Sequence, residues 1–315
     1  MAEKKSRLQP QSPYWYEDLP NHAAPLKVGD DNEKPNLHLD LSYIDENVFE
    51  LSRATSIQRG FGLVMGIATI VGFWSLTPFF VRMYLGGRIS FFLPIILITV
   101  LVAVIYSLKR GIRTPLDLPV LFDRRTGRVF AQEYVAKINP FAKWKTVIKE
   151  FDWSCVEAEI GKIAGYNGKT YSVRYGLILA QCDPGTTKVQ DRIILKQAID
   201  PGALSQMWAY IRCYMNEGPE KLGATKPFPR DVSFRRCMLE FYPFFDFTEE
   251  GKRIRAQMHI VELALIFIVA IPMFWLLVPV QLCEYIGQRL APKPTWPEDV
   301  VNQTGLRSSV PDSLG

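Results

Sequence analysis

The sequence has few of the residues that build most catalytic and metal sites. It contains three histidines, His22, His38 and His259, and they are far apart in the chain. This separation argues against a histidine-based metal site or a catalytic triad, although distant residues can meet in a fold. The motifs G-x-S-x-G, H-E-x-x-H and G-x-G-x-x-G are missing. The sequence therefore nominates no catalytic residue, metal ligand or cofactor site, and we expect a protein that is not an enzyme.

Cysteines are also few, and their spacing suggests no pairing. The five, Cys155, Cys182, Cys213, Cys237 and Cys283, are odd in number and form no C-x-x-C motif. We therefore expect reduced, packed thiols rather than a disulfide framework or a zinc site.

The net charge is +5. We attribute this excess to cytoplasmic flanks of membrane segments, because Lys and Arg gather there, and we expect no nucleic-acid partner.

One stretch, Gly165–Thr170, resembles the end of a phosphate-binding P-loop. That pattern needs a glycine at position 163, where this chain has Ile163. The residues from Tyr171 onward alternate like a β-strand, whereas a P-loop leads into a helix whose N-terminus holds the phosphate. We therefore predict a hairpin turn at Asn167-Gly168 and no nucleotide site.

Two long apolar runs, residues 60–81 and 89–108, contain no charged residue. At about 1.5 Å per residue, each would form a helix of roughly 30 Å, enough to cross a bilayer. We therefore predict a transmembrane hairpin over residues 60–108; the alternative is a helical pair buried in a soluble core, where a polar stripe is usual. Gly62 and Gly66 form a G-x-x-x-G pattern. Such a pattern allows close packing on the second helix or on a second copy of the chain in a homodimer.

A third apolar stretch lies within residues 260–286. Its central part, residues 263–280, has no charge but includes Pro272 and Pro279, which predicts either a kinked third transmembrane helix or a re-entrant segment. Lys and Arg number six in residues 109–128 and two in residues 82–88. This asymmetry predicts a membrane protein with a cytoplasmic N-terminus and central domain.

Residues 111–218 have the pattern of a small β-rich domain. Short β-prone runs flank turn residues, as in the predicted hairpin over residues 120–131. Asp200 and Pro201 mark the start of a helix and Gly218 marks its end, so an amphipathic helix is predicted over residues 201–217. Strands closed by such a helix are typical of a pleckstrin-homology-like barrel. The predicted fold class is a membrane α-helical protein, with a two-helix hairpin and a third C-terminal span, that carries this soluble α+β domain.

The remaining segments are predicted to be arms and linkers. Residues 1–36 are polar and proline-rich, which indicates a disordered arm. Residues 37–59 should form a short segment that joins the soluble domain, residues 219–256 an interfacial linker, and residues 290–315 a flexible tail. No cleavable signal peptide is expected, so the first apolar run would serve as the insertion signal.

The candidate functional residues are basic and aromatic side chains expected next to the membrane. Such residues contact lipid headgroups or partner proteins. Trp153 and Trp208 fit a core, whereas Trp144 lies between two lysines. For the stretch that holds Arg235 and Arg236, simple packing on the domain is an equal alternative. The candidates are Lys109, Arg110, Arg113, Lys143, Trp144, Lys145, Arg235 and Arg236.

Three stretches resemble a bacterial family of uncharacterised membrane proteins often encoded near type VI secretion effectors. They are residues 47–53 with Arg59-Gly60, residues 122–130, and residues 151–153. The resemblance covers about residues 35–245 and implies an immunity role, in which the protein binds a secreted toxin.

Three hypotheses for the function follow from these patterns. The first is a non-enzymatic inner-membrane protein whose cytoplasmic domain binds a protein partner. The second is a lipid-sensing module that binds anionic headgroups. The third, a membrane enzyme or transporter, would need a polar pocket that the sequence does not indicate.

Overall fold

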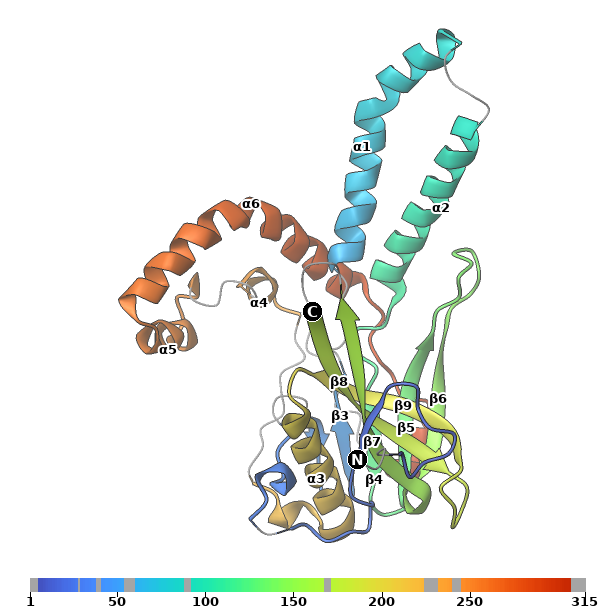
Figure 1. The fold of residues 1–315 in the computed structure, drawn as a ribbon, viewed down its shortest axis with the longest axis vertical. Helices are drawn as coiled ribbons and strands as arrows, with labels where there is room; N and C mark the ends of the chain where they lie inside the picture. The colour runs from blue at the N-terminus through green and yellow to red at the C-terminus, as the bar shows by residue number, and fades with distance from the viewer. Residues whose placement is uncertain are drawn as a thin grey trace.

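The computed structural model describes residues 5–27, 29–37, 41–53, 60–87, 92–166, 171–223, 232–239 and 245–306. It is a mixed α/β fold built around two antiparallel β-sheets. Two long helices, α1 (Gly60–Leu85) and α2 (Phe92–Arg113), project from the sheets as an arm (Figure 1). The C-terminal end of helix α6 (Ile260–Leu290) lies at the base of this arm, and the helix packs against α1.

The first sheet has five strands in the order β2-β3-β4-β5-β6. Their bounds are Leu41–Ile44, Val48–Leu51, Val120–Asp123, Arg128–Val135 and Lys145–Asp152. Strands β3 and β4 pair directly, with Leu51 opposite Val120, although the whole arm lies between them in sequence. The arm is therefore an insertion between two neighbouring strands, and both of its ends return to the same end of this sheet.

The second sheet has four strands in the order β1-β7-β8-β9. Their bounds are Trp15–Asp18, Val156–Tyr166, Tyr171–Cys182 and Val189–Ala198. A 3-10 turn, η3 (Trp153–Cys155), carries the chain from β6 in the first sheet to β7 in the second. The Asp152 side chain caps this turn by accepting a hydrogen bond from the Ser154 N–H.

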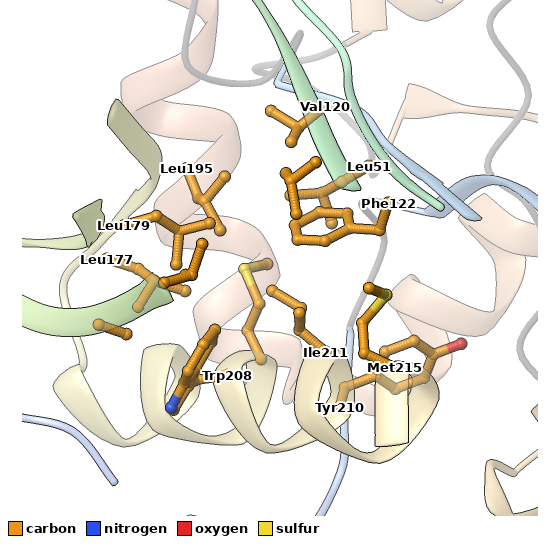
Figure 2. Close-up of a cluster of buried hydrophobic side chains, with 14 of the residues drawn as sticks. Leu51, Val120, Phe122, Leu177, Leu179, Leu195, Trp208, Tyr210, Ile211 and Met215 are labelled. Atoms are coloured by element: carbon orange, nitrogen blue, oxygen red, sulfur yellow. The ribbon is translucent and has the colours of Figure 1, made fainter. Parts of the chain in front are cut away.

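Helix α3 (Pro201–Glu217) closes the space between the sheets. The Asp200 carboxylate accepts hydrogen bonds from the Gly202 and Ala203 N–H groups, and Gly218 follows the helix with φ of 96°. Figure 2 shows side chains of α3 directed at residues from both sheets. The buried core includes Leu51, Val120 and Phe122 from the first sheet, Leu177, Leu179 and Leu195 from the second, and Trp208 and Ile211 from α3.

The prediction of a disordered arm over residues 1–36 is wrong for the described part of that segment. Strand β1 pairs with β7, and a short turn, η1 (Asp31–Glu33), contacts α3. The fully buried Arg212 of α3 donates to the Ala24 carbonyl and pairs with Glu33, both at 2.9 Å. One buried arginine on α3 and the free edge of β7 therefore order a segment whose composition is typical of disorder.

The segments after α3 are also more structured than predicted. The interfacial linker over residues 219–256 contains η4 (Pro219–Lys221), α4 (Phe234–Leu239) and α5 (Glu249–Gln257), and α4 packs on α6. In the expected flexible tail, residues 290–315, helix α7 (Glu298–Thr304) places Val300 and Leu306 in a small core with Leu121 and Phe130. Apolar residues spaced too sparsely to predict a helix therefore cover the outer face of the five-stranded sheet.

The predicted fold class is wrong. Among the described residues, one helical stretch, Gly62–Leu85 in α1, is long and apolar enough to cross a membrane, by length and composition only. The other two apolar runs belong to helices that extend beyond them: α2 continues through Lys109 to Arg113, and α6 continues to Leu290. The strands form separate sheets of four and five rather than a pleckstrin-homology-like barrel, because β1, β2 and β3 join from outside residues 111–218.

The G-x-x-x-G face of α1 is directed at α2. A Cβ atom at Gly62 would lie 3.8 Å from the Ser107 carbonyl oxygen, and one at Gly66 would lie 2.9 Å from Leu108 Cδ2. Gly111 on α2 is equally close to the Leu63 side chain. This face is therefore occupied within the chain, and we do not assign it to a homodimer.

Replacing Gly66 with isoleucine should loosen the α1–α2 packing. The added side chain would overlap Leu108, and overpacking typically costs about 1–3 kcal/mol. The matched control is Gly72→Ile, because a Cβ at Gly72 meets nothing within 4 Å on the same helix. Helical circular dichroism of the detergent-solubilised chain during heating compares the two variants, and equal midpoints would contradict the assignment of this face to α2.

Candidate functional site

Arg53 lies at the point where the chain leaves the first sheet for the arm, and it is 7% exposed. Its guanidinium donates to the carbonyls of Leu118 (2.5 Å), Ile194 (3.0 Å) and Gln132, and it pairs with Glu133 at 2.7 Å. These partners come from the segment after α2, from β9 and from β5. One side chain thus holds the base of the arm against both sheets.

The backbone of Arg53 completes this cluster. Its N–H donates to Asp117 Oδ1 at 2.8 Å, and the same oxygen accepts from the Leu118 N–H at 2.7 Å. Asp117 itself is 2% exposed and lies just beyond the end of α2. We call Arg53, Asp117, Leu118 and Glu133 the arm anchor, because they tie the entry and the exit of the arm together.

A second junction joins α2 to the loop between β5 and β6, residues 136–144. The Lys109 ammonium donates to the carbonyls of Pro140 (2.5 Å) and Ala142 (2.7 Å) and lies 4.9 Å from the centroid of the Trp144 ring. The Trp144 ring packs edge-on against Tyr106 of α2 and Tyr134 of β5. Lys109 and Trp144, two of the predicted contact residues, therefore meet each other inside the protein.

The other predicted basic residues of this region remain on the surface. Arg110, Arg113, Lys143 and Lys145 are exposed. Burial raises the pKa of Tyr134, and the nearby positive charge of Arg113 partly opposes this rise. Four cationic side chains are thus available to solvent at the base of the arm.

Arg235 and Arg236 lie elsewhere, on α4 beside α6. Arg235 forms an ion pair with Asp246. Hydrogen bonds from the Thr248 side chain and backbone, together with Arg235, lower the pKa of Asp246 to about 2. The side chain of Arg236 lies outside the described part of the structure. The predicted basic residues therefore lie in two separate regions, one at the base of the arm and one on α4.

The β5–β6 loop carries two exposed apolar residues that were not among the predicted contact residues. Ile138 is 94% exposed and Phe141 is 74% exposed. The loop is internally bonded, because Asn139 accepts from the Phe141 N–H through its side chain (2.8 Å) and from Trp144 Nε1 through its carbonyl (3.3 Å). The signal in the sequence is the presence of three lysines around these two apolar residues, with no carboxylate within residues 135–145.

A hollow of about 330 Å³ lies between the β2–β3 turn and the segment after α3. Ile44, Pro219 and Leu222 give it apolar walls, and Asp45 and Glu46 stand at its edge. The β2–β3 turn precedes Val48, whereas the arm follows the opposite end of β3, so this distal hollow lies at the end of β3 opposite the arm. The Asp45 carboxylate accepts from the Asn47 and Val48 N–H groups, and Glu46 is exposed.

The remaining polar candidates have structural surroundings. His22 Nδ1 lies 2.9 Å from the Val156 carbonyl and its ring packs against Trp153; His38 and the Asn167-Gly168 turn are outside the described residues. Within the described ranges, no group of three or more His, Cys, Asp or Glu side chains is placed to hold a metal ion. Four cysteines are buried and Cys155 is partly exposed, all as free thiols. Burial raises the pKa of Cys182 to about 11.

A family model described as a family of unknown function (DUF6708) matches residues 97–307. The chain belongs to this family. Comparisons with curated proteins and with solved structures found no match. Membership agrees with the resemblance to an uncharacterised family, while the membrane and secretion associations stay predictions.

The DUF6708 match covers most of α2, strands β4–β9 and helices α3–α7. It leaves out β1, β2, β3 and α1. Both sheets nevertheless take strands from the unmatched part, and Arg53 of the arm anchor also belongs to it. The folded unit is therefore larger than the part of the chain that the family model describes.

Proposed function

We propose that this protein is a non-enzymatic, membrane-anchored binding protein. In this proposal α1 enters the bacterial inner membrane, the two-sheet domain stays on the cytoplasmic side, and the domain binds a protein partner. The observation that carries the proposal is the surface of α1, where Ile70, Trp74 and Phe79 are all exposed and Trp74 reaches 83%.

The length and surface of α1 fit a lipid environment. Residues 62–85 would extend over about 36 Å, more than the roughly 30 Å of a bilayer's hydrocarbon core. Soluble proteins rarely leave a continuous apolar surface of this size exposed to water. The base of the arm carries Lys109, Arg110 and Arg113, whereas residues 82–88, between the two apolar runs, hold two basic residues, Arg82 and Arg88. This bias supports a cytoplasmic domain.

The distal hollow is the surface that we propose for the partner. It lies at the end of β3 opposite the arm, so a membrane-bound protein would present it to the cytoplasm. Its apolar walls with an exposed carboxylate at Glu46 suit an apolar side chain followed by a basic one. The resemblance to proteins encoded near type VI effectors favours a secreted toxin as the partner, and an immunity role for this chain.

Two experiments test this function. Affinity purification of the full-length protein from membranes should recover one toxin-like partner, and deletion of the gene should make the cells sensitive to that toxin. Normal resistance in the deletion strain would reject the immunity role. Recovery of the protein in the soluble fraction would reject membrane anchoring.

Charge reversal at the distal hollow should weaken partner binding. We expect Glu46→Lys to raise the Kd about tenfold, equivalent to about 1.4 kcal/mol, because like charges would then meet at the rim. The control is Glu249→Lys on α5, where the carboxylate is 84% exposed, pairs with Lys252 and lies outside the hollow. Titration of the purified partner against both variants measures the difference, and an unchanged Kd for Glu46→Lys would remove the hollow from the interface.

A second candidate function is a lipid-sensing module that binds anionic headgroups. The exposed Arg110, Arg113, Lys143 and Lys145 beside the arm favour it. The two functions differ in what occupies the distal hollow. A lipid sensor needs no protein there, so deletion of the gene would then leave toxin resistance unchanged. The lipids that copurify with the wild-type protein would include an excess of anionic species.

A further inference from the structure

We propose that the β5–β6 loop, residues 136–144, is an interfacial finger that inserts Ile138 and Phe141 into an anionic lipid surface. This inference rests on the proposed membrane anchoring through α1. It adds a second and separate contact with the bilayer, made by a β-hairpin rather than by a helix.

The loop lies at the level where the candidate membrane stretch begins. Gly62 and Gly66 on α1 stand opposite Ser107 and Leu108 on α2. The next residue, Lys109, reaches the loop through the carbonyls of Pro140 and Ala142. Figure 1 shows the β5–β6 hairpin rising beside the base of α2, on the side of the sheets from which the arm projects. If α1 enters the bilayer from Gly62 onward, this loop therefore meets the headgroup layer.

The composition of the loop suits that layer. Ile138 and Phe141 are both largely exposed, and Lys137, Lys143 and Lys145 are exposed around them. The sequence has no carboxylate between Tyr134 and Thr146. Apolar side chains surrounded by lysines enter the boundary between headgroups and acyl chains, while the ammonium groups contact anionic lipids.

The loop is also held rigid, which favours insertion. Asn139 fixes its turn, and Lys109 holds it from α2, so the exposed side chains are presented without a large loss of conformational entropy on binding. Lys109 and Trp144 thus act as internal supports of the finger. The residues that contact lipid are Ile138, Phe141 and the lysines at 137, 143 and 145.

Site-directed spin labelling of the full chain in nanodiscs tests the proposal. Cys155→Ser provides the background, since the other four thiols are buried. Labels are attached at Ile138→Cys, at Phe141→Cys and, as a control in the β8–β9 turn, at the exposed Lys188→Cys. In nanodiscs with phosphatidylglycerol, the loop labels should gain collisions with oxygen and lose collisions with a water-soluble nickel chelate, whereas the control label should remain accessible to the chelate.

Charge should control the position of the finger. Replacing Lys137, Lys143 and Lys145 with glutamate should lower the equilibrium constant for insertion of the loop by roughly a hundredfold. Each lysine near anionic lipid raises this constant about fivefold. Loop labels as accessible to the nickel chelate as the Lys188→Cys label, in nanodiscs that hold the protein, would overturn the finger and leave the anchoring intact. Failure of the chain to enter nanodiscs at all would overturn both.

Discussion

Replacement of Arg53 with alanine should lower the free energy of unfolding by about 3 kcal/mol, because its buried guanidinium satisfies three carbonyl groups and pairs with the partly exposed Glu133. The substitution leaves Glu133 without its partner and removes donors from the carbonyls of Leu118, Gln132 and Ile194. At about 2–4 °C per kcal/mol for a domain of this size, the unfolding midpoint should fall by about 10 °C. Thermal unfolding of the detergent-solubilised chain measures it.

The matched control is Arg128→Ala. Arg128 pairs with Glu150 between neighbouring strands, but both side chains are about half exposed, so the loss should be about 0–1 kcal/mol. A third variant, Arg53→Lys, keeps the charge but lacks the planar set of donors, and its midpoint should lie between those of the wild type and Arg53→Ala. Equal midpoints for Arg53→Ala and Arg128→Ala would show that the arm anchor contributes no more than a surface pair.

Two arginines on the exposed face of α1 should release the protein from the membrane. Ile70 and Trp74 lie one helical turn apart and are both exposed. Each arginine at the centre of a membrane helix costs about 2.5–3.5 kcal/mol, so the double variant Ile70→Arg with Trp74→Arg should lose about 5–7 kcal/mol of insertion free energy. Fractionation after alkaline extraction, with immunodetection of the pellet and the supernatant, measures the result.

The control for this experiment is Ile199→Arg. Ile199 is 83% exposed, the same fraction as Trp74, but it precedes α3 in the two-sheet domain. If exposed apolar surface alone retained the protein in the pellet, both substitutions would act alike. Retention of the α1 variant at the wild-type level would contradict membrane anchoring through α1.

Local features of the fold could be predicted from the sequence because their signals are local. Asp200, Pro201 and Gly218 define α3 within one stretch of chain. The turn at Gly127, with φ of 67°, similarly defines the β4–β5 hairpin. In both cases the capping or turn residue is adjacent to the element that it ends.

Long-range features could not be predicted, because no local pattern encodes them. The pairing of β3 with β4 joins residues separated by the whole arm. Strand β1, near the N-terminus, pairs with β7, which follows more than a hundred residues later. The apolar runs were mistaken for three spans because composition does not show where a helix ends or which helices pack together. The fold class was therefore wrong even though several of its elements were located.

The candidate site was only partly predictable for a related reason. The sequence around a lysine or a tryptophan does not show whether its side chain contacts solvent or another part of the chain. Lys109 and Trp144 were assigned to the surface, but the Lys109 ammonium lies over the Trp144 ring and also donates to the Pro140 carbonyl of the β5–β6 loop. Ile138 and Phe141 are exposed but were not among the candidates, because an apolar side chain in the sequence does not show whether it packs in a core. Arg53 was overlooked because its partners come from three separate segments.

The position of the arm between β3 and β4 also sets an order for folding. During synthesis β3 emerges well before β4, so its edge has no strand from the following chain to pair with until α1 and α2 have been made. Closing such a long loop is slow, because its entropy is lost before the strands gain any contact. The first sheet can therefore be completed only after α1 and α2 have folded back on each other. A chain in which they have not done so keeps an unpaired strand edge that proteases and chaperones can recognise.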